Sequence, residues 1–386
     1  MISSSPIQNT GVLNGICPYF TMFPLSFPYR LLREHASRKD KVLDPFCGRG
    51  TTLYAARMLG MSAYGIDSNP VAVAITRAKL ANTTQTAIVA AAKYILDTES
   101  ASYCPKGEFW QWAYAPSVLK SLCRLRAALL RDASSAARQA LVGIILGALH
   151  GPKPKSGSSY FSNQCTRTFA PKPAYAVKFW KKRRRRPPEV DVLALITRRA
   201  VRFFSNEEDA ATGRVTKGDS RKKYPFAAVR SARCNWIITS PPYYGMRTYL
   251  PDQWLRLWFL GGPSYVDYTN VGQLNHRSPE IFADELRKVW KNSAEASTRN
   301  CRLVIRFGAI NDRKVDHLDL IKSSLAKTPW RITTVKPAGT ASIGRRQSLH
   351  FAHKTNPALC EHDVWAIKNQ KHRHRFSTGK LRHVLI

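Results

Sequence analysis

The stretch from residue 41 to residue 67 constrains the fold of this chain more than any other part of the sequence. Four local patterns follow one another there: an apolar strand, a turn with two glycines, a helix with apolar residues at helical spacing, and a second strand, at residues 41–43, 44–50, 51–59 and 62–66. Thr51 or Thr52 can cap the helix, and Gly60 ends it. Asp67 follows the second strand directly. The order predicts a parallel strand–helix–strand unit.

The glycine turn and Asp67 together indicate a nucleoside-binding site. Gly48 and Gly50 let the backbone approach a ligand closely, and a carboxylate at the end of the next strand can accept hydrogen bonds from ribose hydroxyls. A dinucleotide site would have a third glycine at the start of the helix, under a pyrophosphate, where this chain has Thr51 and Thr52. The turn therefore suits a nucleoside without phosphates.

A second strand-to-loop junction carries the other chemical motif. The strand predicted at residues 234–238 leads into Thr239-Ser240-Pro241-Pro242-Tyr243. Consecutive prolines have no N–H to donate and hold the backbone extended, which leaves neighbouring carbonyl oxygens as fixed acceptors. With the Ser240 hydroxyl, these oxygens suit an exocyclic amine, and the Tyr243 ring can stack on the planar ring that bears it. In an open α/β sheet this junction would lie at the same edge as the glycine turn.

These motifs resemble those of the amino-methylating DNA methyltransferases. DPFCGRGTT at residues 44–52 resembles the family's cofactor motif, DPFxGxGTT, with Arg49 where a small residue is common, and TSPPY at residues 239–243 resembles its catalytic motif. The resemblance covers residues 19–80 and 215–340. It implies a Rossmann-like class I methyltransferase fold of the α/β class, with a mostly parallel seven-stranded sheet and a helical and basic insertion. It also implies S-adenosyl-L-methionine as cofactor and site-specific methylation of DNA, as in restriction–modification.

The resemblance assigns roles to individual residues. The residues expected to bind the cofactor are Thr21, Asp44, Phe46, Gly48, Gly50, Asp67 and Asp219. Among them, Thr21 would bind the methionine carboxylate, Asp67 the ribose, and Asp219 the amine of the adenine. The residues expected to be catalytic are Ser240, Pro241, Pro242 and Tyr243.

Ser240 favours cytosine N4 over adenine N6 as the methyl acceptor. Adenine enzymes of the family more often have Asp at this position, whereas a hydroxyl can donate as well as accept. The expected reaction is a direct in-line transfer to a base flipped out of the duplex, for which orientation and electrostatics suffice. Cytosine-C5 enzymes instead need a cysteine after a proline. The chain contains no Pro-Cys pair, which excludes that class.

The charge of the chain indicates a polyanionic partner. It has 61 Lys and Arg residues against 25 Asp and Glu, a formal net charge of +36, which points to nucleic acid, here double-stranded DNA. Residues 151–188 contain no acid. The residues expected to contact nucleic-acid phosphate are Lys178, Lys181, Lys182, Arg183, Arg184, Arg185 and Arg186. Aromatic residues interleaved with cations suit base contacts, and here they are Tyr160, Phe161, Phe169, Tyr175, Phe179 and Trp180. The alternative is that this basic run is only a solvated face.

The sequence patterns divide the chain into four parts. We predict the cofactor-binding half of the methyltransferase domain, a helical and basic insertion for target recognition, the catalytic half, and a last strand with a basic tail, at residues 1–100, 101–205, 206–341 and 342–386. Helical patterns occur at residues 87–96, 116–130, 136–150 and 190–204.

Other features of the sequence bear on its location in the cell. No apolar run is long enough to cross a bilayer, the N-terminus lacks the features of a secretion signal, and the eight cysteines form no Cys-x-x-Cys pair. These features predict a cytoplasmic protein. No metal site is predicted, because the cysteines and histidines near the C-terminus match no zinc-binding spacing.

Three other interpretations stay open. The same fold could methylate adenine N6 in DNA, or a base in RNA. The chain could also be a nucleic-acid-binding protein with a degenerate methyltransferase domain, although the six residue types most diagnostic of activity are intact: Gly48, Gly50, Asp67, Pro241, Pro242 and Tyr243. A small-molecule methyltransferase would not need a charge of +36.

Overall fold

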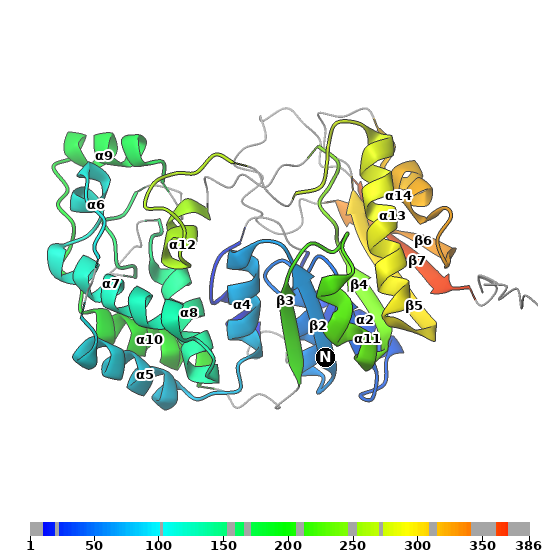
Figure 1. Cartoon of the computed structure of the whole chain (residues 1–386), viewed down its shortest axis with the longest axis horizontal. Coiled ribbons are helices and arrows are strands. Elements are labelled where there is room, and N and C mark those ends of the chain that lie inside the picture. The colour runs from blue at the N-terminus through cyan, green and yellow to red at the C-terminus, as the bar shows by residue number, and fades with distance from the viewer. Residues whose placement is uncertain are drawn as a thin grey trace, which may run out of the picture.

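The computed structural model describes the chain in stretches separated by gaps, and these stretches hold both sequence motifs. They are residues 11–19, 23–100, 103–152, 159–165, 171–205, 212–245, 253–269, 273–308, 315–340 and 360–369. Figure 1 shows two parts side by side: a sheet flanked by helices, and a body made of helices alone. Within the described stretches, no helix is long and apolar enough to cross a membrane.

One sheet of seven strands forms the first part, in the order β3-β2-β1-β4-β5-β7-β6. The strands are β1 (Lys41–Asp44), β2 (Ser62–Asp67), β3 (Gly213–Lys217), β4 (Cys234–Thr239), β5 (Ser297–Gly308), β6 (Trp330–Thr340) and β7 (Cys360–Lys368). Strands β1 to β5 run parallel to one another, whereas β7 is antiparallel to both β5 and β6. The prediction of a mostly parallel seven-stranded sheet is confirmed, and the fold is the Rossmann-like methyltransferase fold.

The sheet is buried on both faces because its central strands are apolar on both sides. Val42 and Leu43 are neighbours in β1, so they point to opposite faces, and each is fully buried. On the Val42 face lie α2 (Ser26–His35) and α3 (Thr51–Met58). The helices on the Leu43 face are α11 (Ala227–Ala232), α13 (Pro279–Glu295) and α14 (His317–Leu325), with the short 3-10 helix η2 (Tyr224–Phe226) before α11.

The helical body packs against α4 (Pro70–Leu80), which separates it from the sheet (Figure 1). Its helices are α5 (Gln85–Thr98), α6 (Glu108–Ala113), α7 (Pro116–Arg131), α8 (Ala136–Ala148), α9 (Pro173–Lys182), α10 (Val192–Phe204) and α12 (Trp254–Phe259). They share one apolar core with α4 and with the N-terminal 3-10 helix η1 (Gly11–Gly15). Helix α12 follows the TSPPY motif in the sequence, so the chain returns to this body after that motif.

Close contacts join the two parts. A Cβ added to Gly143 in α8 would lie 2.3 Å from the Cβ of Ala78 in α4. A Cβ added to Gly147, one turn further along, would lie 2.1 Å from the carbonyl oxygen of Ile16. Glycine at these two positions therefore lets α8 approach both α4 and the N-terminal segment, and a larger side chain would separate them.

The helices at 85–98, 116–131, 136–148 and 192–204 agree with the predicted patterns within a few residues. Helix α9 was not predicted, because proline and cations dominate residues 151–188. It begins with Pro173 in its first turn, where a missing N–H costs nothing, and it buries Ala176, Val177 and Trp180 on one side.

The predicted cap of α3 is wrong. Gly50, in the left-handed region at φ 73°, precedes the helix, and no side chain caps its first turn. Thr52 donates its hydroxyl hydrogen bond elsewhere, to Asp44 at 2.7 Å. The threonine that the pattern offered as a cap instead joins the helix to the end of β1.

Candidate active site

The turn between β1 and α3 requires both of its glycines. Gly48 and Gly50 have φ values of 50° and 73°. A Cβ on Gly50 would lie 2.6 Å from Cγ2 of Thr76, so no larger residue fits there. The Thr76 hydroxyl also donates to the carbonyl oxygen of Gly48 at 3.0 Å. Among the described residues, the Tyr19 ring would be the nearest neighbour of a Cβ on Gly48, at 3.9 Å, so this side of the turn faces Tyr19.

Asp44 links the two sequence motifs. Its carboxylate accepts hydrogen bonds from the hydroxyl of Thr52 at 2.7 Å, from the hydroxyl of Thr239 at 2.6 Å and from the N–H of Phe46 at 3.0 Å. Burial raises the pKa of Asp44 to about 6, against the effect of these three donors. Because β1 and β4 are neighbours in the sheet, the glycine turn and the TSPPY loop begin side by side.

Asp67 holds the glycine turn from the next strand. One oxygen of its carboxylate accepts from the N–H of Gly48 and the other from the N–H of Asn69, each at 2.8 Å. Its side chain is partly exposed, yet the surrounding protein raises its pKa to about 6, because desolvation outweighs the two amide donors. The carboxylate therefore lies at the rim of the turn, and its contact with a ribose stays a prediction.

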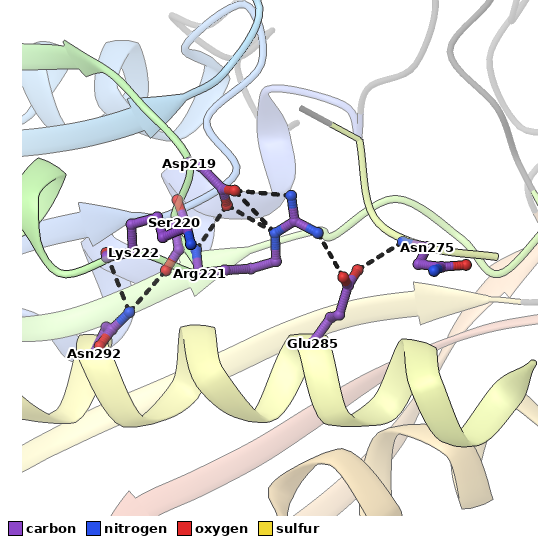
Figure 2. Close-up of polar contacts among 7 residues, drawn as sticks. All are labelled: Asp219, Ser220, Arg221, Lys222, Asn275, Glu285 and Asn292. Carbon is purple, nitrogen blue, oxygen red and sulfur yellow. Dashed lines mark hydrogen bonds and ion pairs between the residues drawn. The ribbon is translucent and has the colours of Figure 1, made fainter. Parts of the chain in front are cut away.

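Asp219 lies in the turn after β3, two residues beyond the strand end. Figure 2 shows its carboxylate facing the guanidinium of Arg221. Nε of Arg221 lies 2.9 and 3.0 Å from the two carboxylate oxygens, and Nη2 lies 2.8 Å from one of them. Burial alone would raise the pKa of Asp219, but the hydrogen bonds and charge of Arg221 hold it below its usual value. Asp219 is therefore ionised at neutral pH and held in one orientation.

Helix α13 fixes this turn from the other side (Figure 2). Glu285 accepts from Nη1 of Arg221 at 2.6 Å, and its second oxygen accepts from the N–H of Asn275 at 2.6 Å. Two turns further along the same helix, the amide of Asn292 donates to the carbonyl oxygens of residues 220 and 222. Ser220 then donates to the carbonyl oxygen of Pro45, at 2.6 Å, in the cofactor motif. The turns after β1 and β3 are thus held together.

The loop after β4 is anchored at Tyr243 and again at Gly245. The Tyr243 hydroxyl donates to Glu361 at 2.5 Å, and its ring lies edge-on to Phe307 with centroids 5.1 Å apart. The N–H of Gly245 donates to Nδ1 of His276 at 2.9 Å. Pro241 is buried and Ser240 is partly exposed. The loop therefore places a tyrosine ring and a serine hydroxyl at the edge where the glycine turn lies.

The basic run lies on the surface of the helical body, on α9 and the residues after it. Six of its seven cations are exposed, and Arg185 is partly buried. Lys181 forms an ion pair with Glu108, and the Arg183 guanidinium lies 4.1 Å from the Phe179 ring centroid. These residues form a cationic surface on the helical body, and their contact with nucleic-acid phosphate stays a prediction.

The expected base contacts of the neighbouring aromatic residues are wrong in part. Phe161 and Trp180 are fully buried, and Phe179 is 8% exposed, so all three belong to the core. Tyr175 is 56% exposed and could still meet a base. Phe169 lies outside the described residues.

Of the residues in and before the cofactor motif, one is not described and one is buried without a full set of partners. Thr21, the candidate for the methionine carboxylate, lies outside the described residues. Arg49 is 8% exposed, and its buried Nε has no hydrogen-bond partner among the described residues. Burial lowers the pKa of Arg49 to about 10. In the described stretches, no group of three or more His, Cys, Asp or Glu side chains is placed to hold a metal ion.

Several residues that hold the site in place were not found from the sequence, among them Arg221, His276, Glu285 and Glu361. Only Arg221 has a local signal, since a cation two residues after Asp219 can fold back onto that carboxylate. The other three lie far along the chain from their partners, and no spacing rule connects them.

Comparison with known proteins gives matches over the first part of the chain. The DNA methylase family model N6_N4_Mtase matches residues 4–78. The type II methyltransferase M.MjaII of Methanocaldococcus jannaschii is 34% identical over 73 residues, which cover 19% of this chain and 14% of that protein. Both matches support the amino-methyltransferase family, and the family model covers the glycine turn but not the TSPPY loop.

Solved structures of other methyltransferases align over most of the chain at low similarity. The rRNA methyltransferase aviRa of Streptomyces viridochromogenes shows 12% identity and a TM-score of 0.37, with 95% of this chain and 94% of that chain covered. A S-adenosylmethionine-dependent methyltransferase of Methanosarcina mazei shows 8% identity and a TM-score of 0.33, with 90% and 98% covered. At these TM-scores the likeness carries no argument about this chain.

The strand order and the glycine turn define the class of the protein: it has the Rossmann-like methyltransferase fold, whose cofactor is S-adenosyl-L-methionine. The residues present fit that cofactor. No described side chain fills the turn on the side of Gly48, and two carboxylates, Asp67 and Asp219, lie beside it, at the end of β2 and in the turn after β3.

Proposed function

We propose that the protein transfers a methyl group from S-adenosyl-L-methionine to the exocyclic amine of a DNA base, with cytosine N4 preferred to adenine N6. The observation that carries this proposal is the double hydrogen bond of Asp44. By accepting from Thr52 and Thr239, Asp44 ties the glycine turn to the TSPPY loop. A nucleoside and a planar amine bound at these two turns would therefore lie next to each other, as a transfer between them needs.

The cofactor residues are assigned from their places around the glycine turn. The bound cofactor would supply an electrophilic methyl group. In the proposal, Gly48 and Gly50 let its nucleoside approach the backbone beside Phe46, Asp67 accepts from the ribose, and Asp219 accepts from the adenine amine. The Arg221 ion pair leaves Asp219 ionised at neutral pH, which suits it as an acceptor.

The TSPPY loop is assigned to the base that receives the methyl group. The Ser240 hydroxyl and the carbonyl oxygens beside Pro241 and Pro242 accept hydrogen bonds from the amine, and Tyr243 stacks on the ring. As the methyl group arrives, the amine gains positive charge, and fixed oxygen acceptors stabilise that charge. The amine would then lose one proton to solvent water, which leaves the methylated base neutral. The hydroxyl of Ser240, which can also donate, supports cytosine over adenine.

Double-stranded DNA is proposed as the substrate because of the charge of the chain. The net charge is +36, and the basic run on α9 is exposed on the helical body. In the proposal the helical body, which comprises most of residues 101–205, contacts DNA phosphate while the base is flipped toward the TSPPY loop. The location is proposed to be the cytoplasm.

The test is to incubate the purified protein with duplex DNA and S-adenosyl-L-methionine, digest the DNA and identify the nucleosides by mass spectrometry. The deoxy form of N4-methylcytidine is the expected product. Tyr243→Ala removes the stacking contact with the base, which should raise the activation free energy of transfer by about 1–3 kcal/mol and slow the reaction accordingly. N6-methyladenosine alone would overturn the choice of base. No methylated base in DNA of varied sequence would overturn DNA methylation as the function, and methylated RNA under the same conditions would identify RNA as the substrate.

A further inference from the structure

Strand β7 brings an acidic residue to the edge of the sheet where the TSPPY loop lies. The parallel strands β4 and β5 end at this edge, whereas β7, which is antiparallel to β5, begins there. Glu361 is the second residue of β7 and lies opposite Gly308, the last residue of β5. Only a strand of reversed direction places its first residues beside the ends of the parallel strands.

Glu361 is buried against Tyr243. It is 4% exposed, and its Oε1 accepts a hydrogen bond of 2.5 Å from the Tyr243 hydroxyl. A buried carboxylate is costly unless it is hydrogen-bonded, and a phenol that donates to a carboxylate makes one of the stronger hydrogen bonds in proteins. The contact therefore fixes the far end of the tyrosine side chain.

Two further neighbours restrict the Tyr243 ring. Phe307 meets it at an interplanar angle of 69° with centroids 5.1 Å apart. Gly308 leaves little room beside it, since a Cβ there would lie 3.2 Å from Cε2 of Tyr243 and 3.0 Å from Cγ of Glu361. The ring is thus held along its edge and at its hydroxyl, and its orientation is set before any base binds.

We propose that Glu361 is a positioning residue for methyl transfer, which acts by fixing the Tyr243 ring as the surface on which the target base stacks. This inference rests on the proposed function, in which Tyr243 contacts that base. A ring held in one orientation loses less freedom when the base binds, and it keeps the amine in line with the methyl group. Without Glu361, the ring can turn about its side-chain torsions and the amine is misaligned.

The test is a double-mutant cycle on the transfer rate. The proteins are the wild type, Glu361→Ala, Tyr243→Phe and the double variant, with Glu361→Gln as the conservative replacement. We expect Glu361→Ala to lower kcat about tenfold to a hundredfold, since a hydrogen bond to a charged group is lost. Glu361→Gln should recover most of that loss, because its amide oxygen still accepts from the phenol. In the Tyr243→Phe background, which has no hydroxyl, Glu361→Ala should lower kcat no further.

Asp363→Ala is the matched control. Asp363 lies on the same strand and forms an ion pair with Arg306, at 2.8 Å, instead of contacting Tyr243. The substitution Asp363→Ala should lower the melting temperature without lowering kcat. Equal losses of kcat from Glu361→Ala with and without the Tyr243 hydroxyl, or an equal loss in Asp363→Ala, would overturn the proposal, because Glu361 would then act only through stability.

Two provisions keep the result interpretable. If Glu361→Ala does not fold, the cycle is run with Glu361→Gln, for which the expected loss is smaller but must again vanish in the Tyr243→Phe background. If the wild type transfers no methyl group, the proposed function fails separately. The affinity of the same four proteins for a duplex oligonucleotide is then measured by fluorescence anisotropy. If the losses of binding free energy in Glu361→Ala and Tyr243→Phe add up in the double variant, the role of Glu361 is overturned.

Discussion

The edge of the sheet and the helical body are held together by different interactions. At the edge, polar groups from distant parts of the chain bind one another, as in the pairs Asp44–Thr239 and Ser220–Pro45. The helical body instead has an aromatic core, in which the Trp110 and Trp258 rings lie 4.6 Å apart, and the cations of α9 lie on its surface.

This difference separates the parts of the molecule that tolerate change from those that do not. When one member of a buried hydrogen bond is removed, its partner is left unsatisfied. Single substitutions in the strand-end turns should therefore lower the stability of the protein strongly. Surface cations contribute little to folding, so the α9 surface should be open to change without loss of stability.

The largest effect is expected at Asp44. Replacing it with Ala leaves three donors without their acceptor, so the free energy of unfolding should decrease by about 3–5 kcal/mol. Urea denaturation measures the change. The control is Asp97→Ala, which removes an exposed ion pair with Lys93 on α5 and should change stability by about 0.5 kcal/mol or less. A similarly small decrease in the free energy of unfolding in both variants would show that the buried hydrogen bonds do not stabilise the edge of the sheet.

The second effect concerns binding of nucleic acid to the helical body. The four residues to neutralise are Lys178, Lys182, Arg183 and Arg184, each replaced by Gln. If all four contact phosphate, the slope of log affinity against log salt on duplex DNA should fall by about 3–4, while stability and cofactor affinity stay unchanged.

The matched control for that surface lies at the opposite edge of the sheet, around the starts of β1 and β5. It consists of four exposed cations: Arg38, Lys39, Lys291 and Arg299. Their replacement by Gln changes the net charge by the same amount but should leave the salt slope unchanged. Equal changes of slope in both variants would mean that total charge, and not the α9 surface, determines binding.

At the strand-end turns, Asp67→Ala should weaken binding of S-adenosyl-L-methionine by roughly tenfold or more, because a charged acceptor for the ribose is lost. Calorimetric titration measures it. Unchanged affinity would remove Asp67 from the cofactor site and leave it only its hydrogen bonds to Gly48 and Asn69.

The pKa of Asp67 predicts a pH dependence for the same step. Because that pKa is raised to about 6, the carboxylate is ionised above pH 7 and becomes protonated as the pH falls through 6. Protonation removes acceptor capacity, so cofactor affinity should be constant above pH 7 and decrease toward pH 5. In Asp67→Asn this decrease should be absent. A decrease of the same size in that variant would assign it to another group.

The smallest effect is expected at Arg221. Arg221→Gln releases Asp219 and breaks the tie to Glu285, so cofactor affinity should fall by about threefold to tenfold, as for one or two partly exposed hydrogen bonds. Arg230→Gln is the control, since Arg230 pairs with Glu295 on the same helix α13. If both variants bind the cofactor as the wild type does, the Asp219 turn holds its shape without the ion pair.

Some of these features follow from the sequence alone because their causes are local. The strand–turn–helix–strand order at residues 41–67 depends on apolar spacing and on two glycines whose φ values are positive. The TSPPY loop likewise depends on two prolines at the end of a buried strand. Apolar periodicity also located four helices of the helical body within a few residues.

Tertiary structure decided which faces these elements turn inward and which distant residues meet. Lys178 and Trp180 are two residues apart in a basic run, yet Lys178 is exposed and Trp180 is buried, because the rest of the helical body covers one side of α9. Glu361 reaches Tyr243 across 118 positions because β7 runs antiparallel between β5 and β6. Spacing along the chain determines local conformation, whereas contacts of this kind depend on the direction and packing of whole elements.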